Sequence, residues 1–273
     1  MEVVCQTCMH HCRLKEGQRG RCGVRKAEGG KVVCENYGMV TALALDPIEK
    51  KPLKMFCPGS RILSVGSYGC NFKCPFCQNY EISMEYQAQA QKAVYLPKEQ
   101  LVQKALEYKS AGNIGVAFTY NEPLVGWEYV LDTAKLVKQA GMKTVLVTNG
   151  SASLEVLEKL LPFIDAMNID LKCFREDGYR RLGGDLETVK AFIKRAAMGC
   201  HVELTTLIVP GLNDDAAQME EEAKWIGAKI PLHVTRFFPR YQMQEVQAAD
   251  VQTVYRMANV AGKYVEHVFV GNC

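Results

Sequence analysis

The sequence predicts an α/β protein built on a parallel sheet, and two observations lead to this fold class. Six short apolar runs recur along the chain from residue 61, and each is followed by a segment with the spacing of an amphipathic helix. The runs do not alternate with polar residues and are rich in β-branched ones, as expected for strands buried on both faces. Six strand–helix units in succession favour a parallel sheet with right-handed crossovers.

These strands and helices alternate along the chain. The predicted strands are Ile62–Gly66, Ile114–Thr119, Thr144–Thr148, Ala166–Leu171, Val202–Val209 and Leu232–Phe238. The predicted helices are Lys98–Ser110, Leu124–Ala140, Leu154–Leu161, Leu186–Met198, Asp215–Lys229 and Asp250–Gly262. Pro97 before the first helix, and Gly112 and Gly141 after the first two, are ordinary start and stop signals. A final run, Tyr264–Val270, is a candidate edge strand.

The N-terminal part has a different texture. Residues 1–31 are rich in Cys, His, Gly and Arg and show neither a helical nor a strand period. Two β-like runs follow, Lys31–Cys34 and Met39–Leu45. We therefore expect residues 1–56 to form a small Cys-rich metal-binding appendage with a β-hairpin. Residues 57–273 then form the catalytic α/β domain.

Composition predicts an ordinary globular protein of the cytoplasm. Apolar residues make up 48% of the 273 residues and charged residues 23%, which excludes a disordered or collagen-like chain. The net charge of +3 is too small to indicate a nucleic-acid surface. No apolar run reaches the length of a membrane span, and the N-terminus becomes polar and cysteine-rich at once. Neither a membrane partner nor a secretory signal is therefore expected.

The 12 cysteines are the unusual feature of the composition, and seven of them fall into two tight groups within the first 77 residues. In a secreted disulfide scaffold the cysteines are spread through a short, loop-rich chain. Residues two or three positions apart can instead converge on one metal. The pattern therefore indicates an oxygen-sensitive metalloprotein of a reducing compartment.

The later group, Cys70, Cys74 and Cys77, follows the first predicted strand with the spacing C-x3-C-x2-C. Three thiolates on one loop can hold three corners of a [4Fe–4S] cluster and leave the fourth iron without a protein ligand. A catalytic metal centre requires such an open position. The alternatives are a zinc site completed elsewhere and buried cysteines that bind nothing.

With Phe76 before the last cysteine, this loop resembles the signature of the radical S-adenosylmethionine (SAM) enzymes, C-x3-C-x-Φ-C with an aromatic Φ. The resemblance runs from about Cys5 to Gly271. It is closest to the branch with the pyruvate formate-lyase activating enzymes and, within it, to the radical SAM member of the AmmeMemoRadiSam system. It implies an open partial (β/α)6 TIM-like barrel in which SAM chelates the fourth iron and Phe76 lies against the adenine. The reduced cluster then cleaves SAM to a 5′-deoxyadenosyl radical that abstracts hydrogen.

The resemblance extends to two SAM-binding residues after the second strand. Asn121 and Glu122 stand where the branch has a G-G-E-P-like motif that contacts the SAM amino group. An amide and a carboxylate can accept hydrogen bonds from an ammonium group. The structural alternative is a helix N-terminal turn, because Pro123 suits a first helical position.

Asp170 and Lys172 match a D-x-K pair that lies near SAM and the peptide substrate in the activating enzymes. We assign them as catalytic and SAM-binding residues, with a surface ion pair as the alternative. Pro210, in Val-Pro-Gly-Leu-Asn-Asp, matches a loop that borders the SAM site.

Two positions depart from the activating enzymes. Val147 replaces an acid before Thr-Asn-Gly, and Phe238 stands where a histidine is usual. SAM contacts from these two loops must then come from the backbone, from Asn149 or from Arg236, or be absent. The missing acid and imidazole argue against an exact transfer of glycyl-radical function.

The earlier group, Cys5, Cys8, Cys12 and Cys22, reads C-x2-C-x3-C-x9-C, with two histidines as alternate ligands. Four soft ligands close a tetrahedral site, which suits zinc or an auxiliary iron–sulfur cluster, with zinc slightly favoured. Disulfides are the alternative and are disfavoured in a reducing cytoplasm. A region without an apolar period cannot build a core, so the metal would supply its folding energy.

The remaining cysteines have weaker signals. Cys34, Cys57, Cys173 and Cys200 lie in or beside apolar runs and are expected to be buried free thiols. Cys173 follows Lys172 and is the candidate among them for a role beside the substrate. Related chains often continue past the position of Cys273, so this one is either naturally short or trimmed.

The favoured function is hydrogen abstraction from a protein or peptide, with glycyl-radical generation as one version. No long insertion between Cys77 and Val270 roofs the barrel mouth, and an uncovered site admits a macromolecule. The alternatives are radical modification of a small-molecule or RNA-borne substrate and a non-catalytic Fe–S protein that passes electrons. The resemblance implies flavodoxin or ferredoxin as the reductant, and no nucleic-acid partner is expected.

Overall fold

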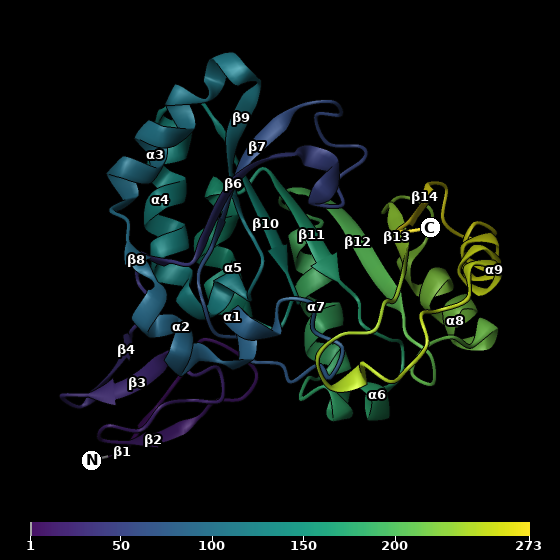
Figure 1. The fold of residues 1–273 in the computed structure, drawn as a ribbon, viewed down its shortest axis with the longest axis horizontal. Helices are drawn as coiled ribbons and strands as arrows, with labels where there is room; N and C mark the ends of the chain where they lie inside the picture. The colour runs from purple at the N-terminus through teal and green to yellow at the C-terminus, as the bar shows by residue number, and fades with distance from the viewer. Residues whose placement is uncertain (1) are drawn as a thin grey trace.

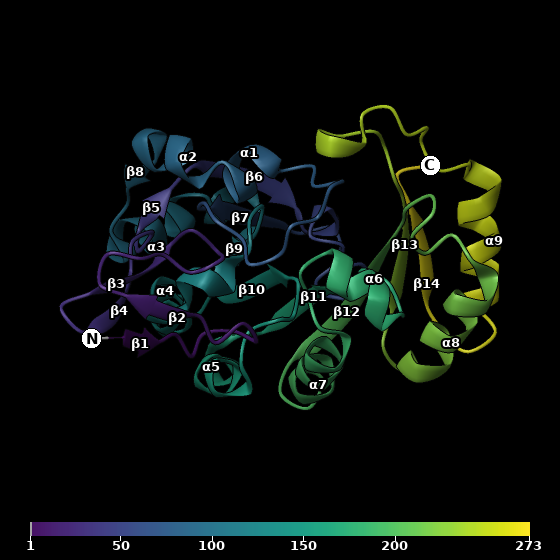
Figure 2. The same ribbon diagram turned by 90° about the horizontal axis from the view of Figure 1, so that it is seen from below.

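A curved, mainly parallel sheet of eight strands forms the centre of the protein. The computed structural model describes residues 2–273. The strands of this sheet are β6 (Ala42–Pro47), β7 (Arg61–Gly66), β9 (Asn113–Phe118), β10 (Lys143–Thr148), β11 (Ala166–Asp170), β12 (His201–Ile208), β13 (Leu232–Arg236) and β14 (Val268–Gly271). Their order is β14-β13-β12-β11-β10-β9-β7-β6, and only β6 runs antiparallel to its neighbour. Because β6 and β14 are edge strands that do not pair with each other, the barrel is open (Figure 2).

Helices cover the outer side of this sheet (Figures 1 and 2). The longer ones are α3 (Lys98–Glu107), α4 (Trp127–Gln139), α5 (Leu154–Leu160), α7 (Leu186–Ala196), α8 (Ala216–Ile226) and α9 (Val251–Ala261). Short helices are α1 (Tyr80–Met84), α2 (Tyr86–Lys92) and α6 (Glu176–Arg181), and single 3₁₀ turns are η1 (Ile48–Lys50), η2 (Lys109–Ala111), η3 (Pro123–Gly126), η4 (Leu161–Phe163) and η5 (Tyr241–Met243). Ser153, Asp185, Asp215 and Asp250 cap four of the longer helices, because their side-chain oxygens accept hydrogen bonds from first-turn N–H groups.

The prediction of an open partial (β/α)6 barrel is confirmed. Each of the six predicted strands and six predicted helices corresponds to one element of the structure, with ends displaced by a few residues. The candidate edge strand near the C-terminus is β14, which pairs in parallel with β13. The helices α1, α2 and α6 were not predicted because they are short, and α2 buries none of its residues.

The N-terminal module consists of small two-stranded sheets. Their strands are β1 (Glu2–Val4), β2 (Arg13–Lys15), β3 (Arg25–Glu28), β4 (Lys31–Cys34), β5 (Met39–Val40) and β8 (Val94–Tyr95). β3 and β4 form an antiparallel hairpin, as do β1 and β2. The predicted run Met39–Leu45 is divided between two sheets, because β5 pairs with β8 and β6 pairs with β7. The main sheet therefore begins before residue 57, and a domain boundary at this point stays a prediction.

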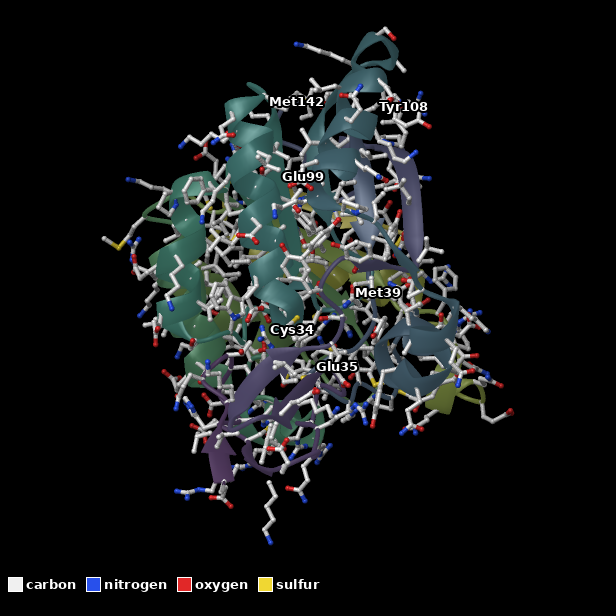
Figure 3. The ribbon with its side chains drawn as sticks, turned by 90° about the vertical axis from the view of Figure 1, so that its left-hand side faces the viewer. Cys34, Glu35, Met39, Glu99, Tyr108 and Met142 are labelled. Carbon is white, nitrogen blue, oxygen red and sulfur yellow. The ribbon has the colours of Figure 1, made fainter. Side chains whose placement is uncertain are left out.

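Arg25 attaches this module to the barrel. Its side chain is 3% exposed and donates to both carboxylate oxygens of Glu128 at 2.5 and 2.6 Å and to the carbonyl oxygen of Val125 at 2.6 Å. Glu128 lies in the first turn of α4. Figure 3 shows the N-terminal module from the side, with Cys34 and Glu35 below the helices of the barrel.

Residues 48–56, which we call the floor segment, close the end of the barrel at which the strands begin. Ile48 and Leu53 are fully buried and pack against Ile62, Val145 and Ala166 inside the sheet. The segment is also tied by polar contacts to the inward-facing side chains of β11 and β12. The barrel interior is therefore accessible from the end at which the parallel strands finish.

Within the described residues, no helix is both long and apolar enough to cross a membrane.

Candidate functional site

A cavity of about 540 Å³ occupies the barrel interior above the floor segment and reaches the loops that follow the parallel strands. Its wall contains Cys70, Cys74 and Cys77 on the loop after β7, together with Phe76. It also contains the predicted residues of the next three loops, which are Asn121, Glu122, Asn149, Asp170 and Lys172. Loops from neighbouring parallel strands meet at one edge of a sheet, which is why residues so distant in sequence share this wall. The structure therefore brings together every predicted cluster- and SAM-binding residue except Pro210.

The cysteine loop turns at Gly69, whose φ of 89° lies in the left-handed region. A Cβ atom at this position would lie 2.7 Å from the carbonyl oxygen of Cys22 in the N-terminal module. Only glycine therefore permits this close approach. Within the loop, the Cys77 N–H donates to the Cys74 carbonyl at 3.2 Å, which folds the last two thiols onto one side.

The three thiols fit an iron–sulfur cluster by their chemistry. Burial raises the pKa of each, to about 12 for Cys74. Metal binding requires thiolates, so a cationic cluster would stabilise the deprotonated form that burial alone disfavours. No fourth cysteine lines the cavity. Three sulfur donors beside open space match a [4Fe–4S] cluster with one iron free for another ligand.

Asn121 and Glu122 lie beside this loop, but both are engaged in hydrogen bonds within the protein. Asn121 accepts from the Ser67 N–H at 3.0 Å and donates to the Gly69 carbonyl at 3.0 Å, so it braces the start of the cysteine loop. Glu122 accepts from the Leu124 N–H at 3.0 Å, and therefore caps η3. Glu122 therefore has both roles that the sequence suggested, because it caps a helical turn and also lines the cavity.

Glu122 also connects the second loop with the third. It accepts from the Thr148 hydroxyl at 2.7 Å and from the Asn149 N–H at 2.7 Å. Burial raises the pKa of Glu122 to about 7, against the effect of these three donors, which favour the charged form. A carboxylate has about four acceptor positions and these three donors occupy three of them, so Glu122, which lines the cavity, can accept one further hydrogen bond.

Asn149 belongs to a polar network that reaches the N-terminal module. Its amide donates to the Asn71 side chain at 3.0 Å and lies 3.9 Å from the Cys70 sulfur. Asn71 in turn donates to the Ser151 hydroxyl at 2.7 Å, and its carbonyl oxygen is 3.0 Å from a ring nitrogen of His10. Asn71 was not predicted as a site residue, although it lies next to Cys70 in the sequence.

Asp170 and Lys172 form an ion pair in the cavity wall, with 2.7 Å between Oδ2 and Nζ. Burial alone would lower the pKa of Lys172, but Asp170 and the Cys74 thiolate raise it above the usual value. The backbone of Lys172 is held on both sides, since its N–H donates to the Tyr179 hydroxyl at 3.1 Å and its carbonyl accepts from Asn213 at 3.0 Å. The pair faces the cavity rather than the outer surface.

Four other residues that the sequence analysis singled out do not line the cavity. Pro210 does not line the cavity, and the neighbouring Asn213 supports Lys172 instead. Arg236 donates to the Ala249 carbonyl at 2.7 Å and is likewise outside the cavity wall. Cys173 is fully buried and packs beside Gly178, so it has no access to a substrate. Cys57 is exposed, contrary to the prediction, because it lies in the turn that leads into β7.

The segment between β13 and α9 partly covers the mouth, which the sequence did not predict. The Gln242 N–H donates to the carbonyl of Pro75 in the cysteine loop at 3.0 Å. Tyr241 stacks on Tyr80 with ring centres 4.7 Å apart. This segment therefore crosses from the last strand–helix unit to the first.

The structure also places His233 of β13 in the cavity wall, with its ring bonded to buried Glu203 of β12. Sequence reasoning missed this pair, because a histidine and a glutamate thirty residues apart in apolar runs give no local signal.

The four cysteines of the N-terminal module differ in burial, and a backbone hydrogen bond links two of them. Cys5, Cys8 and Cys22 are buried and Cys12 is half-buried. The Cys5 N–H donates to the Cys12 carbonyl at 3.0 Å, and burial raises the pKa of Cys8 to about 11. In residues 2–273, however, no three His, Cys, Asp or Glu side chains surround a common point where a single ion could bind. Metal binding by this group stays a prediction.

Comparison with known proteins supports the same chemistry. The family model described as the Radical SAM superfamily matches residues 64–225, more than half of the chain. The chain is 37% identical to a protein of Methanocaldococcus jannaschii, named Uncharacterized protein MJ0808, over 99% of this chain and 81% of that one. It is 30% identical to the pyruvate formate-lyase-activating enzyme of Clostridium pasteurianum, over 62% of this chain and 70% of that enzyme.

A solved structure shares the fold. The crystal structure of Streptococcus suis SuiB matches with a TM-score of 0.59 at 15% identity, over 76% of this chain and 48% of that one. The matched family segment begins inside β7, shortly before the three cysteines of the cavity wall, and extends through β12 into α8. The chain therefore belongs to the radical SAM superfamily of enzymes, whose cofactors are a [4Fe–4S] cluster and SAM.

Proposed function

We propose that this enzyme binds its cluster through Cys70, Cys74 and Cys77 and abstracts hydrogen from a protein or peptide, with glycyl-radical generation as one version of this reaction. When bound, the cluster and SAM supply a 5′-deoxyadenosyl radical that abstracts a hydrogen atom from the substrate. The observation that carries the proposal is one cavity with the buried Cys74 and the half-buried Cys70 and Cys77 in its wall, and with the Asp170–Lys172 pair in the same wall. Relatives support the glycyl-radical version, since they include the Clostridium pasteurianum enzyme and a Putative glycyl-radical enzyme activating enzyme of Methanocaldococcus jannaschii, 25% identical over 74% of this chain.

The chain's own residues bind and orient the reactants. The Lys172 ammonium group can bind the SAM carboxylate, and Asp170 holds that ammonium in place. Phe76 is 4% exposed and offers an aromatic face beside the cysteines for the adenine. Glu122 and Asn149 can accept from and donate to the polar groups of SAM, because both line the cavity.

The open barrel supports a macromolecular substrate. β14 and β6 leave the sheet unclosed, and the segment that contains Tyr241 bridges only part of the mouth. A loop of another protein can therefore reach the cavity, whereas a site for a small metabolite is more often enclosed.

The proposal includes two accessory features. Lys73 and Arg21 are exposed near the cysteine loop and give an acidic electron donor, such as flavodoxin or ferredoxin, a cationic contact. Cys5, Cys8, Cys12 and Cys22 bind zinc, or an auxiliary iron–sulfur cluster, and stabilise the N-terminal module.

Deuterium transfer tests the substrate class. The reduced holoenzyme is incubated with SAM and with deuterium-labelled cell extract divided into protein, RNA and small-metabolite fractions. We expect deuterium in 5′-deoxyadenosine from the protein fraction only, and none with Cys74→Ala, which lacks one cluster ligand. Label that comes only from the metabolite or RNA fraction would refute the proposal.

A further inference from the structure

The cavity has a second half that the SAM-binding residues do not occupy. In the sheet register, Asp170 of β11 lies opposite Thr205 of β12, which lies opposite His233 of β13, and His233 lies opposite Phe269 of β14. All four line the cavity. One row of side chains therefore leads from the Asp170–Lys172 pair on β11 to the edge strand β14. His233 lies in this row between Thr205 and Phe269.

Glu203 holds the His233 ring. Nε2 of His233 lies 2.6 Å from the carboxylate, and Nε2 of His201 lies 2.9 Å from its other oxygen. The N–H groups of Lys54 and Met55 in the floor segment donate to the same two oxygens at 2.9 and 2.8 Å. Burial alone would raise the pKa of Glu203, but these donors lower it to about 2, so the carboxylate is charged throughout the physiological range.

A carboxylate only accepts hydrogen bonds, so His233 must carry a proton on Nε2. The remaining polar atom of the ring is Nδ1, which has no hydrogen-bond partner in residues 2–273. Within the same residues, a few side-chain polar atoms are completely buried and lack a hydrogen-bond partner, and Nδ1 of His233 is not one of them. The ring therefore presents an unused polar atom at the wall of the cavity, in an orientation fixed from behind by Glu203.

The surroundings of this atom indicate what it binds. The other cavity-lining side chains of β12, β13 and β14 are uncharged: Thr205, Leu207, Thr235, Phe269 and Val270. The nearest arginine on β13, Arg236, is engaged with the Ala249 carbonyl outside the wall. These strands offer no cationic side chain to a phosphate group, and the two lysines that line the cavity from the floor segment, Lys50 and Lys54, lie there together with the acidic Glu49. β14 has an unpaired edge, and Val270 and Gly271 on it also line the cavity, so backbone groups for an extended peptide are close by.

We propose that His233 is a substrate-contacting residue, whose Nδ1 forms a hydrogen bond with a backbone amide of a peptide segment in the β12–β14 half of the cavity. An amide offers both an N–H donor and a carbonyl acceptor, so it matches either protonation state of Nδ1. Glu203 is the positioning residue that orients the ring. This inference rests on the proposed peptide substrate and adds the place and the side chain that bind it.

Diethyl pyrocarbonate footprinting, read by mass spectrometry, tests the location in the holoenzyme. His267, which is exposed, serves as the internal reference. We expect His233 to be modified equally with and without SAM, and to be protected at least fivefold by a capped, uncharged glycine-containing peptide at millimolar concentration. Protection by SAM alone, protection by adenosine monophosphate in place of the peptide, or no protection by the peptide would each overturn the proposal.

Two matched variants separate substrate contact from structural support. The amide of His233→Gln can replace the Nε2 donor to Glu203 but leaves nothing at the position of Nδ1. The shorter His233→Asn places its amide near Nδ1 and leaves Glu203 one donor short. We expect peptide protection of the neighbouring Lys54, measured by acetylation footprinting, to be lost in His233→Gln and retained in His233→Asn. A purely structural role predicts the opposite order, which would refute the contact.

Measuring SAM cleavage separates a failure of peptide binding at His233 from a failure of the proposed radical function. Formation of 5′-deoxyadenosine from SAM without substrate is measured alongside for the wild type and for both variants. If the wild type itself forms none, the radical chemistry fails while the footprint still reports whether a peptide binds at His233. A tenfold loss of SAM cleavage in both variants would instead assign His233 to the SAM site.

Discussion

Replacing Glu222 with glutamine should change how the stability of this enzyme depends on pH. Glu222 lies on α8 and is 1% exposed, and burial raises its pKa to about 8. Within residues 2–273 its carboxyl group has no cationic partner and forms one hydrogen bond, with the Thr206 hydroxyl, which also lies 3.1 Å from the Leu171 carbonyl. If Glu222 is protonated, it donates to the Thr206 hydroxyl and this hydroxyl donates to the Leu171 carbonyl, so all three groups have a hydrogen-bond partner.

The magnitude follows from the difference in proton binding between the two states. An unfolded glutamate has a pKa near its model value of 4.5. Between that value and about 8 the folded protein keeps a proton that the unfolded chain has lost, so the free energy of unfolding falls as pH rises. The slope is at most about 1.4 kcal/mol per pH unit for one proton. From pH 5.5 to 7.5 the wild type should therefore lose up to about 2.7 kcal/mol relative to Glu222→Gln.

Urea unfolding followed by pulse proteolysis at several pH values measures this difference in the holoenzyme. The variant should be the more stable protein at pH 8, although it can be slightly less stable at pH 5. All other titrating groups are shared, so their contributions cancel when the two profiles are subtracted. Parallel profiles for the wild type and Glu222→Gln would refute the reasoning.

Three further predictions concern the N-terminal module and its link to the site. Arg25→Met should destabilise the protein by about 2–4 kcal/mol, because it leaves the Val125 carbonyl and Glu128 without their buried partner. The exposed control Arg195→Met should cost less than about 1 kcal/mol, and equal thermal shifts would contradict this account. Cys12→Ala should remove the N-terminal metal alone in metal analysis, and simultaneous loss of the catalytic cluster would show that there is only one site. Asn71→Ala should weaken SAM binding roughly tenfold, because Asn149 loses its partner, and an unchanged dissociation constant would place Asn149 outside the SAM site.

The secondary structure was predictable because its signals are local. Unalternated β-branched runs marked the strands, and amphipathic spacing marked the helices α3, α4, α5, α7, α8 and α9. Asp215 and Asp250 stood at the starts of their helices, where a side-chain cap is favoured. The cysteine loop was predictable for the same reason, since its three ligands lie within eight residues.

Features that depend on distant pairings were not predictable in this way. β6 joins the main sheet through β7, and nothing in Ala42–Pro47 itself distinguishes that partner from β4. Glu203 and His233 come together only because β12 and β13 are neighbours in register. Pro210 does not line the cavity, and its assignment to the border of the SAM site stays a prediction.

The central claim is that the thiols of Cys70, Cys74 and Cys77 hold the cluster that cleaves SAM, and one measurement tests it directly. Anaerobically reconstituted wild type, Cys74→Ala and the exposed control Cys57→Ala are reduced with dithionite, and 5′-deoxyadenosine and bound iron are quantified together. The wild type and Cys57→Ala should form 5′-deoxyadenosine at similar rates. Cys74→Ala should lose about four irons and at least 99% of the product while keeping its circular dichroism spectrum, as expected from the loss of one ligand of a [4Fe–4S] cluster. Full SAM cleavage by Cys74→Ala would contradict the assignment.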